Sequence, residues 1–374
     1  NYHVNPIQVW GYETKKTDSL ILFDEEIIAA FGSDDNVLEM VLPHKPKKFY
    51  YSPMNNRTLV LSKKALNWPK PTGITTRMEL EQNFDANAAY YHISGNKLLF
   101  SGKVVLDRLV AIPANYSVYI MPGTSIELQG EGGLIVSNSF YAEGTETRPI
   151  QIFSTDSLTN GITVLNGKEA KLSYVFVNGL SNLNYKNWEL TGAVTFYETP
   201  VFMNHCSITE NNSEDALNII RSAFTIDDLH IALTTSDGFD ADFCTGEITN
   251  SRFVNTGNDC IDFSGSVVSI SGIAIENSGD KGISGGEAST LTLSDIEIDG
   301  AITGIASKDG SVLTGADIRI ANVEFGYSAF QKKSGFGKVT CVAFASINAC
   351  LSSSNLSLHC PLRSRKTNFN PFRP

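Results

Sequence analysis

Between Glu214 and about Ala345, apolar and polar positions repeat with a period of about 22 residues. Within each repeat, short runs such as VVSISGIAIEN, STLTLSDIEID and SVLTGADIRIA alternate apolar with polar residues, which is typical of strands with one buried face. Helical periodicity is absent from this region. Repeats of this kind stack on one another, because one repeat alone cannot bury its apolar face. The pattern predicts an all-β fold, a right-handed parallel β-helix with about 22 residues per turn.

One apolar position recurs in every repeat and predicts which side chains point into the coil. Its occupants are Leu217, Phe239, Ile261, Ile283, Ile305 and Tyr327. Because side chains alternate along a strand, the residues one and three positions later should face outward. The first outward column is Asn218, Asp240, Asp262, Ser284, Ala306 and Ser328. The second outward column is Ile220, Asp242, Ser264, Gly286, Lys308 and Phe330.

Acidic residues of consecutive repeats fall close together on this predicted surface. The position just before the strand, at a corner of the coil, is occupied in turn by Asp215, Asp237, Asp259, Lys281, Thr303 and Phe325. Neighbouring strands lie about 4.8 Å apart. The repeat therefore predicts one crowded patch, with Lys281 on the next turn, that consists of Asp237, Asp240, Asp242, Asp259 and Asp262. Carboxylates one rung apart repel, so the patch implies raised pKa values, a bound cation or a lysine neighbour.

The rest of the chain does not share the regular repeat. Residues 1–87 are richer in Lys, Pro and aromatic residues and predict a small β-rich segment. Residues 88–345 are predicted to form the β-helix, with looser spacing over 160–213 and one longer insertion, GLSNLNYKNWELTG. Residues 346–374 lose the alternation and turn basic, which indicates a disordered or aberrant tail.

Composition and charge narrow the range of possible functions and partners. The 374 residues are 42% apolar, enough for a large core, and the net charge is −11. Without a basic stripe, nucleic acid and anionic membranes are poor partners, and no apolar run is long enough for a membrane span. The six cysteines show no zinc spacing, and we interpret Cys206, Cys244 and Cys260 as small buried residues rather than disulfides. The chain begins at Asn1 without a signal-like segment, which suggests a mature or truncated product.

Part of the repeat, SDGFDADF…NTGNDCIDFSGS…NSGDKGISGGE, resembles the strand wall of polygalacturonase-type pectinases. That family carries Asn-Thr-Asp-Gly, then Asp-Asp-Cys, then Gly-His-Gly followed by Ile-Ser on successive turns. Asp237 and Asp259 match two of its acids, whereas Asn258 replaces another, and Asp280 or Lys281 stands at the histidine position. Inverting hydrolases need one carboxyl group as acid and a second as base. The departures therefore count against ordinary pectin hydrolysis.

A second resemblance is to alginate epimerases and calcium-dependent lyases of the same fold. Gly238-Phe239-Asp240 matches the start of the epimerase element Gly-Phe-Asp-Pro-His, with Ala241-Asp242 in place of Pro-His. The resemblance implies an acidic glycan, a cation that holds its carboxylate and a base that removes the neighbouring proton. The candidate catalytic residues are Asp237, Asp259, Lys281 and Lys308. The candidate Ca²⁺ ligands are Asp240, Asp242 and Asp262.

Over about 250 residues, from SGNKLLF to AFQKK, the chain resembles right-handed parallel β-helix (pectin-lyase-like) modules of bacterial surface and secreted proteins. The phrases that carry this resemblance are DGFDADF, NDCIDFSGS, GDKGISGGE and GIASKD. Such modules are often appended to spore-coat-kinase-like or lamin-tail-like domains. The resemblance implies an extracellular or cell-surface protein with a polysaccharide or cell-surface glycan as its partner. It implies no settled activity.

Two interpretations of the patch remain open. In the first, the protein acts on or binds a polysaccharide, as a Ca²⁺-assisted lyase or epimerase of acidic glycans. In the second, it is a non-enzymatic surface, adhesion or spacer module, whose corner aspartates accept backbone N–H bonds and close each coil. Lys281 and Lys308 would then be counter-charges to Asp280, Glu287 and Asp309. Coil closure does not require the outward carboxylates of Asp240, Asp242 and Asp262.

Overall fold

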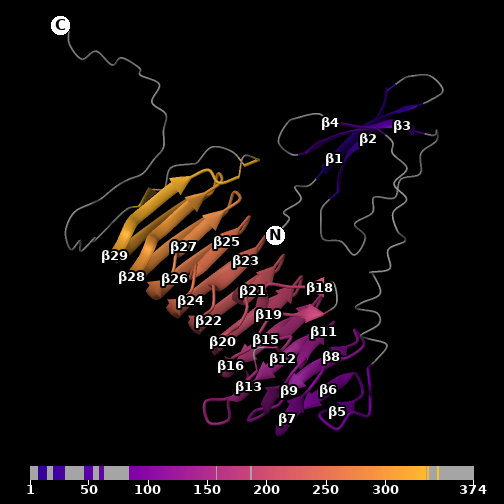
Figure 1. Cartoon of the computed structure of the whole chain (residues 1–374), viewed down its shortest axis with the longest axis vertical. Coiled ribbons are helices and arrows are strands. Elements are labelled where there is room, and N and C mark those ends of the chain that lie inside the picture. The colour runs from indigo at the N-terminus through magenta and orange to yellow at the C-terminus, as the bar shows by residue number, and fades with distance from the viewer. Residues whose placement is uncertain are drawn as a thin grey trace. The chain divides into compact units, whose positions relative to one another are not determined.

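The structure is a computed structural model that divides the chain into two compact units, Asn1–Thr72 and Gly73–Pro374. It describes the strands within 7–14, 20–29, 46–53, 59–62 and 343–344, and residues 84–156, 158–185, 188–333 and 335–336. The first unit contains a four-stranded antiparallel sheet in the order β2-β1-β3-β4 (Figure 1). Its strands are β1 (Ile7–Thr14), β2 (Leu20–Ala29), β3 (Pro46–Pro53) and β4 (Leu59–Ser62).

The second unit is a parallel β-helix in which the chain passes through three ladders of strands on every turn (Figure 1). The first ladder contains β6 (Lys97–Phe100), β9 (Ser117–Ile120), β12 (Phe140–Glu143), β15 (Ala170–Ser173), the first parts of β20 (Val201–Thr209), β22 (Ala223–Thr234), β24 (Thr245–Thr256), β26 (Val267–Ser278), β28 (Thr290–Lys308) and β29 (Val312–Phe330), and β30 (Ala343–Phe344). The short strand β5 (His92–Ser94) pairs antiparallel with β6.

The second ladder contains β7 (Lys103–Leu106), β10 (Ser125–Leu128), β13 (Ile150–Ser154), β16 (Val175–Asn178) and the later parts of β20, β22, β24, β26, β28 and β29. The third contains β8 (Leu109–Ile112), β11 (Gly133–Val136), β14 (Ile162–Leu165), β19 (Gly192–Tyr197), β21 (Asp215–Ile220), β23 (Asp237–Asp242), β25 (Ile261–Ser264), β27 (Lys281–Gly286) and the ends of β28 and β29. The predicted fold class is therefore confirmed.

The predicted inward column forms the core of the third ladder. Phe239 pairs in register with Ile261, and Ile261 with Ile283, so one turn is 22 residues here. The column is buried from Leu217 to Ile305, and Tyr327 packs against the same core in the last described turn. Alternation along each strand explains the match, because only every second side chain reaches the interior.

One corner between the second and third ladders is formed by residues that tolerate a left-handed backbone. Asn255, Asn277, Gly300 and Asn322 follow one another along one corner, and all have positive φ, a conformation that Gly and Asn tolerate best. The Asn277 side-chain amide donates to Asn255 Oδ1 at 3.0 Å, which links successive turns. Short polar side chains thus close the coil and connect its turns.

Close approach of the backbone, rather than positive φ, explains the glycine beside the aspartate corner. A Cβ atom at Gly238 would lie 2.6 Å from the carbonyl oxygen of Cys260. Cys206, Cys244 and Cys260 are buried free thiols, as predicted. No helix among the described residues is long and apolar enough to cross a membrane.

The insertion GLSNLNYKNWELTG, residues 179–192, lies over the outer face of the third ladder in its early turns. It contains β17 (Asn184–Tyr185) and β18 (Trp188–Glu189), which pair antiparallel. Leu183 is fully buried in a second, small apolar cluster with Ala111, Ile135 and Leu165, and Tyr185, Trp188 and Leu190 pack against it. The early turns of this face are therefore covered by the chain itself.

Residues 346–374 and their predicted disorder lie outside the described residues. The boundaries predicted for the three segments, 1–87, 88–345 and 346–374, stay predictions.

Candidate functional site

The predicted aspartates lie together on the outer face and corner of the third ladder. Asp240 pairs in register with Asp262, and both are half-buried. Asp215 pairs with Asp237 at the corner one turn earlier. We call the six neighbouring aspartates the acidic cluster, which comprises Asp215, Asp237, Asp240, Asp242, Asp259 and Asp262. Asp215 was read from the sequence as a corner residue only, and its place in the cluster was missed.

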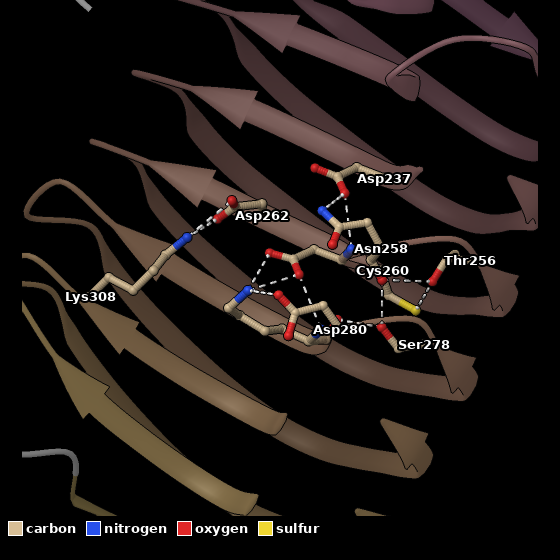
Figure 2. A network of polar contacts seen from close by, with 10 residues as sticks. Asp237, Thr256, Asn258, Cys260, Asp262, Ser278, Asp280 and Lys308 are labelled. Atoms are coloured by element: carbon tan, nitrogen blue, oxygen red, sulfur yellow. Dashed lines mark hydrogen bonds and ion pairs between the residues drawn. The ribbon is translucent and has the colours of Figure 1, made fainter. Parts of the chain in front are cut away.

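The corner aspartates link one turn to the next by hydrogen bonds. Asp237 Oδ1 accepts from the backbone N–H of Asp259 at 2.9 Å and from Asn258 Nδ2 at 2.7 Å (Figure 2). Asp259 Oδ1 in turn accepts from the backbone N–H of Lys281 at 3.1 Å. These are the contacts expected if the corner carboxylates close the coil. Their predicted catalytic role stays a prediction.

Lys281 is held between two carboxylates. Its Nζ lies 3.2 Å from Asp259 Oδ1 and also contacts Asp280 Oδ2. Burial lowers the pKa of Lys281, but the charges of Asp259 and Asp280 outweigh it, and the net pKa is raised. A general base needs a lowered lysine pKa, so in this arrangement Lys281 is a protonated counter-ion.

Lys308 reaches back across two turns of the coil. Its Nζ lies 3.1 Å from Asp262 Oδ2 (Figure 2), and its side chain is 7% exposed. Gly286, in the turn between them, makes room for it, because a Cβ there would lie 3.3 Å from Lys308 Cε. The partner of Lys308 is therefore Asp262, and not the Glu287 or Asp309 considered from the sequence.

Lys333 supplies a third cation that the sequence reading missed. It pairs with Glu287, whose side chain is 4% exposed. Asp309 Oδ1 accepts the backbone N–H groups of Lys332 and Lys333, both at 2.6 Å, and so fixes the segment after β29. Burial lowers the pKa of Lys333, and Asp242, Asp262 and Asp240 oppose that shift. Lys333 occupies none of the inward, outward or corner positions that recur along the repeat, so their spacing offered no signal.

Burial raises the pKa of most carboxyl groups in the acidic cluster. The pKa of Asp215 is raised to about 7 and that of Asp242 to about 6, with burial the main cause and neighbouring carboxylates adding to it. Burial and Asp262 raise the pKa of Asp259 to about 6 despite Lys281. Asp237 and Asp240 shift in the same direction, Asp240 strongly. The cluster therefore holds carboxyl groups that exchange protons near neutral pH.

Several outward positions are more covered than simple alternation predicts. Asn218, Ser284 and Ala306 face outward by register, yet all three are buried. The Asn218 side-chain oxygen and the Ser284 hydroxyl have no hydrogen-bond partner among the described residues. Polar atoms in this state are rare in folded proteins and mark candidate ligand contacts.

Cys260 lies beside the cluster but is chemically inert. Its Sγ is 3.0 Å from Thr256 Oγ1 (Figure 2), and burial raises the pKa of the thiol to about 11. A thiol of this kind is protonated at neutral pH and is a poor nucleophile. It fills space at the corner.

The predicted calcium ligands do not form a ready site. Among the residues that the structure describes, no group of three or more His, Cys, Asp or Glu side chains is placed to hold a metal ion. Asp262 is already paired with Lys308, and the charge of Lys333 acts on Asp242. The arrangement does not fit a Ca²⁺ site, which takes six to eight oxygen ligands.

No family model matches the sequence, and no curated protein matches it significantly. Among solved structures, the chain is similar to pectate lyase Pel9A, with 12% identity and a TM-score of 0.23 over 68% of this chain and 79% of that one. It is also similar to an alginate lyase from Paenibacillus sp. str. FPU-7, with 12% identity and a TM-score of 0.17 over 61% of this chain and 93% of that one.

A third similar structure is the catalytic unit of a thermostable GH87 alpha-1,3-glucanase from Streptomyces thermodiastaticus strain HF3-3. It has 8% identity and a TM-score of 0.20, and the alignment covers 70% of this chain and 62% of that one. At these TM-scores the three likenesses support no inference about activity. The predicted link to modules beside spore-coat-kinase-like or lamin-tail-like domains stays a prediction.

Proposed function

We propose that the outer face of the third ladder binds a polysaccharide and that the acidic cluster carries out acid–base chemistry on it. The observation that supports this most is Asp242, a half-buried carboxyl group whose pKa is raised to about 6, next to Asp240 on the same strand. A group that is partly protonated near neutral pH is suited to give or accept a proton. Perturbed carboxyl groups gathered on one face are more frequent at functional sites than elsewhere.

The roles divide between the corner and the outward column. Asp237 and Asp259 accept backbone N–H groups, so in this proposal they position the turns. Asp240 and Asp242 face outward and remain half-buried. They are the groups that contact the sugar, while Lys281 and Lys308 hold the charges of Asp259 and Asp262.

The lyase or epimerase reaction and the help of Ca²⁺ are finer proposals than this one. Such a reaction needs a cation at the substrate carboxylate. Because the carboxylates do not converge on a metal site, we derive no step through calcium. An extracellular or cell-surface location likewise remains part of the proposal, and it rests on the sequence resemblance alone.

The rival function is a non-enzymatic surface or spacer module. The hydrogen bonds from Asp237 to the next corner support it for that column. These hydrogen bonds do not explain why Asp240 and Asp242 place carboxyl groups on the outer face, because neither residue closes a corner. The two functions therefore differ in whether the outward carboxyl groups matter to a ligand.

A screen of the full chain against acidic, neutral and amino polysaccharides tests the proposal. Binding is measured by affinity electrophoresis, and products by new reducing ends and by the ultraviolet absorbance of unsaturated sugars. We expect retardation by at least one glycan, lost in Asp242→Asn and kept in the control Glu247→Gln, whose carboxylate is exposed on the first ladder. Binding without product limits the function to recognition. If no glycan retards the chain, the spacer function stands.

A further inference from the structure

Asp240 is a member of the acidic cluster whose carboxyl group has neither an ion pair nor a hydrogen-bond partner among the described residues. Asp259 forms an ion pair with Lys281, and Asp262 forms one with Lys308. Burial and the neighbouring carboxylates raise the pKa of Asp240, and Lys333 is a cation whose charge reaches it without forming an ion pair. Within the acidic cluster, the described ion pairs with lysine thus form only in the later turns. We call the end without an ion pair the Asp240 subsite, formed by Asp215, Asn218, Asp240 and Asp242.

The amide side chain of Asn218 gives the subsite an acceptor that lacks a donor. Asn218 is 2% exposed and is the register partner of Asp240 in the turn before. Its Nδ2 donates to Asp215 Oδ2 at 2.9 Å, which aims the side-chain oxygen away from Asp215, and that oxygen has no partner. A buried acceptor without a donor destabilises the fold, because it has lost its hydrogen bond to water. A ligand that brings a donor would remove this cost.

We propose that the Asp240 subsite binds the ammonium group of a glycan that contains unacetylated amino sugars. This inference rests on the proposed function and names its substrate class. An ammonium group carries a positive charge and three N–H donors, and it has no acceptor. The subsite presents three matching acceptors: the side-chain oxygen of Asn218 and the carboxylates of Asp240 and Asp242.

Other sugar substituents match the subsite less well. An N-acetyl group has one N–H donor and no charge, and its carbonyl oxygen would face carboxylates. A uronate would add a further negative charge to a place where carboxylates already repel. Lys308 shows the favoured chemistry within the same face, because its ammonium group binds Asp262 at 3.1 Å and 3.2 Å.

A glycan fits the adjoining column better than a polyamine does. Ser284 follows Asp262 along this outward column, and its buried hydroxyl group has no partner among the described residues. Sugar hydroxyl groups can donate to such atoms and accept from them. The methylene stem of a polyamine would leave the serine unsatisfied.

Titration calorimetry of the full chain at about pH 6 tests the inference with four ligands: the glucosamine hexamer, the N-acetylglucosamine hexamer, oligogalacturonate and spermine. We expect the glucosamine hexamer to bind at least about tenfold more tightly than the other three, as the loss of one charged hydrogen bond predicts. Asp240→Asn should weaken that binding about tenfold, and Glu247→Gln should leave it within about twofold. Thermal unfolding of each variant verifies that it is folded.

The other outcomes overturn the inference in distinguishable ways. Tighter binding of oligogalacturonate or of the acetylated hexamer keeps the proposed polysaccharide function and removes the amino-sugar class. Equal binding of spermine shows an amine site without sugar selectivity. Unchanged affinity in a folded Asp240→Asn variant places the ligand elsewhere. If none of the glycans binds in this assay or in the wider screen, the inference and the proposed function fail together.

Discussion

The early and the middle turns of the third ladder present the same strand positions to the outside but cover them differently. In the early turns, Ala111, Ile135 and Leu165 are apolar and lie beneath the insertion 179–192, which buries Leu183 among them. In the middle turns, the same columns carry Asp240, Asp242 and Asp262, and of these three only Asp262 is paired with a lysine, Lys308, among the residues that the structure describes. The backbone does not dictate the difference. The side chains decide whether a turn is covered by the chain itself or presents carboxyl groups on its outer face.

The largest expected effect is a fall in the free energy of unfolding as the pH rises. Its cause is the carboxyl groups of the acidic cluster. The folded pKa of Asp215, about 7, lies above its ordinary value of 3.8. A raised acid pKa contributes stability that is fully present below the unfolded pKa and lost as pH rises through the folded pKa. Deprotonation of Asp215 alone is expected to lower the free energy of unfolding by on the order of 4 kcal/mol between about pH 4 and 7.5. Asp242 and Asp259 add to the loss in the same direction.

Denaturant unfolding at a series of pH values measures this slope. In Asp215→Asn the loss should be smaller by about the contribution of Asp215, because the amide keeps a polar group of the same shape without a charge, while Asp242 and Asp259 still contribute. A wild-type stability that stays flat or increases over this range would contradict the raised pKa values.

The stability of the early turns, which the insertion 179–192 covers, should depend on packing and not on pH. Leu183→Ala removes a fully buried side chain and should lower the free energy of unfolding by about 2 to 4 kcal/mol, as similar core truncations do. The matched control is Leu158→Ala, because Leu158 is 73% exposed, and a change below about 0.5 kcal/mol is expected. If Leu183→Ala is as mild as the control, the insertion does not hold the early turns closed.

Lys308 should matter because its loss leaves a half-buried carboxylate unpaired. Lys308→Met keeps most of the apolar stem and should lower the free energy of unfolding by about 1 to 3 kcal/mol at neutral pH. Adding Asp262→Asn should restore most of that loss. A double variant no more stable than Lys308→Met would show that the pair is not coupled.

The smallest expected effect separates corner closure from charge. Asp237→Ala removes the acceptor for two N–H groups and should cost about 1 to 2 kcal/mol. Asp237→Asn retains an acceptor oxygen and should cost less. Equal losses in the two variants, read from the same unfolding curves, would mean that the carboxylate charge rather than the hydrogen bonds stabilises the corner.

The repeat was sufficient to predict the coil, its inward column and the acidic patch. Strand alternation and a fixed period determine these features locally, so Phe239, Ile261 and Asp240 could be placed from spacing alone. The ion pairs could not be predicted from the spacing. Lys308 reaches two turns back because Gly286 leaves space, and Lys333 lies outside the inward, outward and corner columns of the repeat. Nor does the period indicate that Asn218 and Ser284 are buried, since that depends on what lies over the face.

Carboxyl footprinting tests the central claim most directly, namely that the acidic turns are completed by a ligand whereas the early turns are completed by the chain. The full chain is labelled with a carbodiimide and an amine reagent, with and without the glucosamine hexamer, and each site is quantified by mass spectrometry. The account predicts that the hexamer protects Asp240 and Asp242 and leaves Glu247 unchanged. Equal labelling of Asp240 and Asp242 with and without the hexamer, at a concentration where it binds, would contradict it.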